Sequence, residues 1–127
     1  MVRWWTLTAS YALVIAVLSV IPIPQPVGNA VGRLDKLMHL CEYLLLAWCV
    51  VQAARASGFP RTKTLMVACL LPTSFGLLLE GVQGLLPYRS AEGLDALANA
   101  IGAGLGTWIG LITKRPPSTD HRPPCKG

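Results

Sequence analysis

The chain has 127 residues, of which 53% are hydrophobic and only 13% are charged, and its formal net charge is +5. About a quarter of the residues of an ordinary soluble domain are charged, so this composition excludes a typical soluble fold and equally an acidic or disordered chain. The 11 Lys and Arg residues are spread between apolar runs, which argues against a nucleic-acid-binding surface. The composition therefore indicates a small membrane protein, and nothing in it implies a cofactor.

Four apolar segments are long enough to cross a membrane, since a helix needs about 20 apolar residues to span about 30 Å of hydrocarbon. They cover about residues 4–21, 34–54, 64–86 and 94–112, and the third contains Pro72. We therefore expect an all-α membrane protein, a bundle of four transmembrane helices forming one domain over residues 1–115. Residues 116–127 contain four prolines and few apolar residues, which predicts a disordered cytoplasmic tail.

Basic residues predict the orientation, because short loops rich in Lys and Arg stay in the cytoplasm. With the N-terminus inside, eight basic residues are cytoplasmic and three are external. The cytoplasmic set is Arg3, Arg55, Arg61, Lys63, Lys114, Arg115, Arg122 and Lys126, and the external set is Arg33, Lys36 and Arg89. We therefore expect both termini in the cytoplasm. A cleaved signal peptide is the competing interpretation of the first segment, although its apolar run exceeds the usual 7 to 15 residues.

Polar residues share defined faces of three of the predicted helices. Asp35, His39 and Tyr43 are four residues apart on the second helix, and Glu42 shares their face. One-turn spacings pair Glu80 with Gln83 on the third helix and Asp95 with Asn99 on the fourth. Ionisable groups inside a span are costly and usually face a bundle interior or a water-filled cavity.

These polar faces lie at a common depth. His39, Glu80 and Asn99 are each about five or six residues, or about 8 to 9 Å, from the predicted outer end of their helix. We therefore expect the three to approach one another, with Asp35, Tyr43, Gln83, Arg89 and Asp95 around them. The fourth helix continues this face with Gly102, Gly106 and Gly110, a row that permits close packing within the bundle or in a homo-oligomer.

The order and spacing of these residues resemble the VanZ-like family of small bacterial membrane proteins. The resemblance covers residues 35–106 and rests on Asp35-Lys36-Leu37-Met38-His39, Tyr43, Glu80-Gly81-Val82-Gln83, Pro87-Tyr88-Arg89, Asp95, Asn99, Gly102 and Gly106. It implies a multi-pass protein of the bacterial inner membrane with a cell-envelope role, like the accessory protein of glycopeptide resistance that lowers susceptibility to teicoplanin. The chain departs from the family at Leu40, where an aromatic residue is common, and in its short loop containing Glu92.

The resemblance carries over to nine site residues: Asp35, Lys36, His39, Tyr43, Glu80, Gln83, Arg89, Asp95 and Asn99. One interpretation is a binding site for an anionic lipid or a lipid-linked envelope intermediate, with external basic residues gripping phosphate. A second is a membrane enzyme with His39 or Glu80 as general base and Arg89 as electrostatic stabiliser, although no nucleophile is evident. A third is a proton-coupled transporter, and a fourth is a purely structural polar network.

A metal site is only weakly indicated. His39, Glu42 and Glu80 form the one conceivable ligand set, and a single histidine with scattered carboxylates is a poor pattern for a metal. Cys41, Cys49 and Cys69 lie in predicted spans without a CxxC pair, so we expect packing residues there. We therefore expect no metal in this protein.

Overall fold

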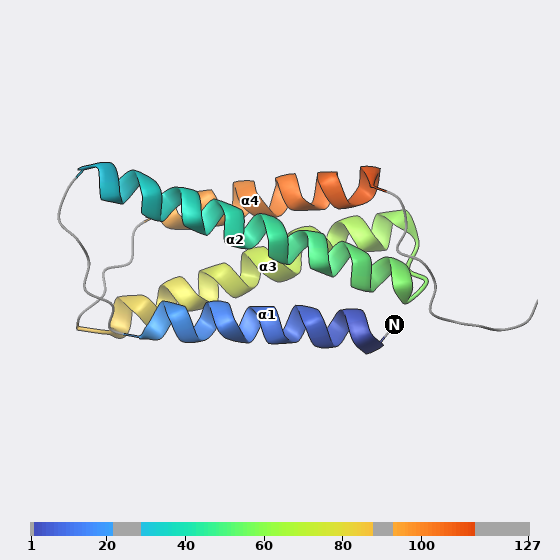
Figure 1. The fold of residues 1–127 in the computed structure, drawn as a ribbon, viewed down its shortest axis with the longest axis horizontal. Helices are drawn as coiled ribbons and strands as arrows, with labels where there is room; N and C mark the ends of the chain where they lie inside the picture. The colour runs from blue at the N-terminus through green and yellow to red at the C-terminus, as the bar shows by residue number, and fades with distance from the viewer. Residues whose placement is uncertain (1, 22–28, 88–92, 114–127) are drawn as a thin grey trace, which may run out of the picture.

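The structure is a computed structural model that describes residues 2–21, 29–87 and 93–113. For residues 29–32 and 35 it describes the backbone alone. Its four helices are α1 (Val2–Val20), α2 (Asn29–Ala56), α3 (Arg61–Leu85) and α4 (Gly93–Ile112). They lie side by side along one long axis (Figure 1). All four are long and apolar enough to cross a membrane, so the prediction of an all-α bundle of four membrane-compatible helices is confirmed. The orientation of the bundle in its membrane stays a prediction.

The helix limits differ from the predicted ones mainly at α2. The other three helices begin and end within three residues of the expected positions, whereas α2 begins at Asn29, five residues before the predicted start. Residues 29–33 follow the last of three closely spaced prolines and contain no further proline, so nothing prevents the helix from starting there. The predicted disordered tail, residues 116–127, lies outside the described residues.

A tight turn connects α2 to α3. Gly58 has φ +78°, a left-handed conformation that glycine adopts without a steric penalty and that commonly ends helices. The amide of Phe59 donates to the carbonyl of Ala54 at 3.0 Å, which satisfies one of the last carbonyls of α2. Pro60 then precedes the first residue of α3 with φ −64° and ψ 159°. This turn brings α3 back antiparallel to α2.

The glycine row of α4 packs against α2. A Cβ atom at Gly102 would collide with the carbonyl oxygen of Leu40, and one at Gly106 with that of Leu44. The contacting residues advance by four positions on both helices, from Leu40 to Leu44 and from Gly102 to Gly106. The helices α2 and α4 therefore run parallel, as Figure 1 also shows. The row is therefore buried within a single chain, and an association between copies, which stays a prediction, would need another face.

Apolar side chains fill the interior and also cover the outside. One buried cluster contains Ile15, Tyr43, Leu46 and Leu79, so it joins α1, α2 and α3. The face of α4 opposite the glycine row exposes Leu94, Leu97, Ile101, Leu105, Trp108 and Ile112. An exposed apolar face along the whole length of a helix fits contact with lipid.

Candidate functional site

Polar side chains from three helices are buried in the half of the bundle where α2 and α4 begin and α3 ends. We call this set the polar layer: His39, Tyr43, Glu80, Gln83, Asp95 and Asn99. Five of them are almost completely buried, with exposed fractions of 2% for Tyr43, 9% for Glu80, 5% for Gln83, 7% for Asp95 and 3% for Asn99. The predicted polar faces therefore do point into the bundle.

Residues of three helices meet at Gly76. A Cβ atom at this glycine would lie 2.9 Å from Cε1 of Tyr43 and 3.0 Å from Nδ2 of Asn99. The aromatic ring from α2 and the amide from α4 thus both rest against the bare backbone of α3. Gly76 was not among the predicted site residues, although it precedes Glu80 by one helical turn and shares its face.

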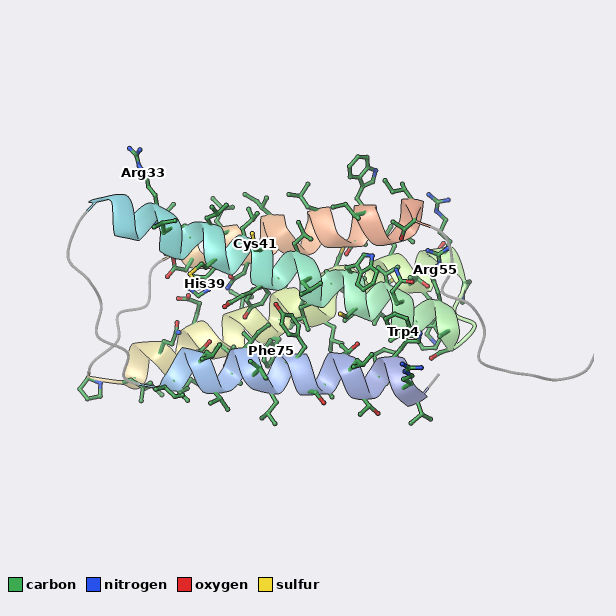
Figure 2. The ribbon with its side chains drawn as sticks, in the orientation of Figure 1. Trp4, Arg33, His39, Cys41, Arg55 and Phe75 are labelled. Carbon is green, nitrogen blue, oxygen red and sulfur yellow. The ribbon has the colours of Figure 1, made fainter. Side chains whose placement is uncertain are left out.

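Two ionisable side chains lie near Tyr43 in the sequence of α2. The side chains of His39 and Glu42 lie one turn apart on α2, with Nδ1 of the histidine 3.9 Å from a carboxylate oxygen. Figure 2 shows His39 on the interior side of α2. The layer thus contains an imidazole and a phenol from α2 and a carboxylate from α3, and Glu42 lies beside the imidazole.

Gln83 has a partner that the sequence did not reveal. Its Nε2 donates to the backbone carbonyl of Ser19 at 3.1 Å, which ties the end of α3 to the end of α1. The Ser19 hydroxyl donates to the carbonyl of Ile15 within its own helix at 2.7 Å. The hydrogen bond from Gln83 to Ser19 therefore gives Gln83 a role in packing α3 against α1.

Asn99 presents an unsatisfied acceptor. Its Oδ1 is buried and has no hydrogen-bond partner among the described residues, and the same holds for Nε2 of Gln52 in the other half of α2. A buried polar atom without a partner costs about 1 to 3 kcal/mol. Such atoms call for an explanation, of which a ligand or water that supplies the missing bond is one.

The structure describes only some of the basic residues that were predicted at the outer end of the bundle. Arg89 lies outside the described residues, as does the side chain of Asp35. Arg33 is exposed and points away from the bundle (Figure 2), whereas Lys36, one turn before His39, is partly buried. Of the predicted anion-binding residues, Lys36 is thus the one with a described and partly buried side chain.

The arrangement suits hydrogen bonding better than metal binding. Within the described ranges, no three His, Cys, Asp or Glu side chains are gathered closely enough to hold a metal ion. The three described cysteines are free thiols. A cluster of carboxylates, amides and a phenol can instead accept and donate several hydrogen bonds to a polar ligand.

Comparisons with family models, curated proteins and solved structures give no match to this chain.

Proposed function

We propose that the chain is a VanZ-like protein of the bacterial inner membrane whose polar layer binds the head of an anionic lipid or lipid-linked envelope intermediate. The observation that carries this proposal is the burial of Glu80, Asp95 and Asn99, from two helices, together with Tyr43 from a third. Stabilisation alone is a poor reason for such residues, because hydrogen bonds between membrane helices contribute only about 0.6 kcal/mol each on average.

The chemistry of the layer favours a ligand with hydroxyl groups and a phosphate. Carboxylates and the open acceptor of Asn99 accept hydrogen bonds, so a sugar or glycerol head supplies suitable donors. Lys36 lies one turn toward the start of α2 from His39, where an ammonium group can pair with a phosphate. Arg89 is expected to assist it from the loop.

Catalysis is the second function that this site would suit. The nearby pair of His39 and Glu42 is a candidate general base, but no nucleophile accompanies it in the described part of the layer. Cys41 is exposed on another face of α2. We therefore place binding ahead of catalysis.

Binding can be measured with purified protein and short-chain lipid-linked sugar phosphates. Asn99→Ala is expected to weaken binding at least tenfold, because it removes the open acceptor from the layer. Gln52→Ala is the matched control, since it truncates another buried amide with an unsatisfied atom outside the layer and is expected to leave binding unchanged. Equal loss in both variants, or no binding by the unmodified protein, would contradict the proposal.

The cellular role can be tested in a deletion strain of the source bacterium. Envelope-drug sensitivity and the accumulation of lipid-linked intermediates are the two measurements, and we expect both to rise. Restoration by the unmodified gene but not by the Asn99→Ala gene would connect the phenotype to the layer.

A further inference from the structure

The opposite half of the bundle carries a separate set of features, which the polar layer does not use. This end, where α1 and α3 begin and α2 and α4 end, has the described basic residues Arg3, Arg55, Arg61 and Lys63. The described acidic residues, Asp35, Glu42, Glu80 and Asp95, all belong to the other half. We call the end that carries Arg3, Arg55, Arg61 and Lys63 the basic end. It attracts negative charge whatever the polar layer binds.

One of these four cations is already used within the fold. Nη1 of Arg55 donates to the carbonyls of Gly110 at 2.7 Å and Thr113 at 2.9 Å, so it caps the end of α4 and complements the helix dipole. Arg3, Arg61 and Lys63 are exposed. These three remain accessible to a ligand.

Aromatic contacts join the starts of α1 and α3 to the turn between α2 and α3. Nζ of Lys63 lies 4.1 Å above the ring of Phe59, and the rings of Phe59 and Trp5 are 6.5 Å apart. The indole of Trp5 donates to Ser57 at 2.7 Å. Tryptophan beside basic residues is typical of a membrane–water interface.

Two apolar grooves lead from this basic and aromatic rim toward the middle of the bundle. The first, of about 230 Å³, is lined by Trp5, Thr8, Ala9, Ala12, Leu46, Val50, Leu71, Pro72 and Phe75, from α1, α2 and α3. Its α1 wall extends over about 10 Å. Two small side chains, Ala9 and Ala12, form part of the α1 wall.

The second groove is an open one along α3. Its volume is about 660 Å³. It is lined by Pro60 and by seven residues of α3: Thr62, Lys63, Met66, Val67, Leu70, Leu71 and Ser74. From Lys63 to Ser74 it extends about 17 Å along the helix, close to the depth of one lipid leaflet, about 15 Å. Both grooves are lined almost entirely by apolar atoms, and Leu71 borders both.

We propose that the basic end binds one anionic diacyl phospholipid, with its phosphate beside Arg61 and Lys63 and one acyl chain in each groove, on either side of Leu71. Charge complementarity selects the anionic head. Two adjoining apolar grooves that start at one basic rim select a molecule with two chains. This site is independent of the polar layer, so either proposal can fail without the other.

The head group is tested by competition. The full chain in detergent is mixed with equal amounts of phosphatidylglycerol and phosphatidylcholine that have identical acyl chains, and retained lipid is measured by native mass spectrometry. We expect phosphatidylglycerol to be preferred over phosphatidylcholine. Arg61→Gln and Lys63→Gln should each reduce the preference roughly fivefold, the ratio that corresponds to about 1 kcal/mol per basic residue.

Arg33→Gln is the control for charge, because this cation is also exposed and lies at the other end of the molecule. It is expected to leave the preference unchanged. Equal loss in Arg33→Gln, or no preference for phosphatidylglycerol in the unmodified protein, would overturn the proposal.

The grooves are tested by filling one of them. Ala9→Trp places an indole in the first groove, whereas Ser10→Trp adds the same side chain at the neighbouring exposed position, which does not line it. We expect Ala9→Trp to lower retention of phosphatidylglycerol at least fivefold and Ser10→Trp to leave it unchanged. Equal retention in the two variants would overturn the assignment of a chain to this groove.

Photolabelling of the unmodified protein tests the grooves without any variant. Phosphatidylglycerol with a diazirine near the end of each chain should label residues 8–12 and 70–75, and excess unlabelled phosphatidylglycerol should suppress this labelling more strongly than phosphatidylcholine. Uniform labelling of the exposed faces of α1 and α4 would show ordinary bilayer contact and overturn the proposal.

Discussion

Replacing Gly106 by alanine tests how closely α2 and α4 approach. The added Cβ would meet the carbonyl oxygen of Leu44 and would lie 2.8 Å from its carbonyl carbon, whereas ordinary contacts start at 3.4 Å. The two backbones must therefore separate by at least about 0.6 Å, and overpacking of this kind costs roughly 1 to 3 kcal/mol. Because both partners are helix backbone, a change of side-chain rotamer cannot relieve the collision.

Gly104 provides the matched control on the same helix, since a Cβ atom there would meet nothing within 4 Å. Both substitutions gain the same helix propensity, up to about 1 kcal/mol, so the difference between the variants isolates the packing term. We expect Gly106→Ala to be less stable than Gly104→Ala by about 1 to 3 kcal/mol. Stability is measured by titration with sodium dodecyl sulfate in mixed micelles, followed by circular dichroism. Equal stability of the two variants would refute the close approach of α2 and α4.

Three further predictions concern the polar layer and the topology. Gly76→Ala should displace the Tyr43 ring and weaken binding of lipid-linked sugar phosphates several-fold, whereas Gly81→Ala, which meets nothing within 4 Å, should not; equal binding would remove Gly76 from the site. Glu80→Gln should leave the amount of protein and its thermal stability normal, because an amide preserves hydrogen bonding in a structural network. It should abolish binding, because it removes the charge, and full binding would favour a packing network. A cysteine at Arg89, in a background without native cysteines, should react with an impermeant maleimide in whole cells, and reaction only after permeabilisation would reverse the predicted orientation.

The parts of the fold that follow from periodicity were predictable from the sequence. Four apolar runs of sufficient length gave four helices, and the one-turn spacing of Asp95, Asn99, Gly102 and Gly106 correctly identified the buried face of α4. Local spacing suffices there because a single helix fixes which of its side chains share a face. The start of α2 was missed, since residues 29–33 lack the apolar character by which a span is recognised.

Contacts between helices were harder to predict, because they depend on which atom of a neighbour lies opposite. The partner of Gln83 is a backbone carbonyl on α1, and a carbonyl leaves no mark in the sequence. Gly76 looked like any glycine in a membrane helix until the ring of Tyr43 and the amide of Asn99 were found against it. The groove beside Ala9 has the same origin, since its volume depends on how far α1 stands from α3.

The contacts of α1 depend less on residue type than the contact of α4 with α2, and the reason lies in how each helix is held. Hydrogen bonds between described residues attach α1 at several points, among them those from Trp5 to Ser57, from Tyr11 to the carbonyl of Glu42, and from Gln83 to the carbonyl of Ser19. Two of the three end on a backbone carbonyl, which any residue supplies, so they restrict the sequence at only one of their two ends. The contact of α4 with α2 instead requires glycine itself, because even a methyl group at Gly102 or Gly106 collides with helix backbone. The packing of α4 on α2 is therefore stricter in the residues it requires than the hydrogen bonds that hold α1.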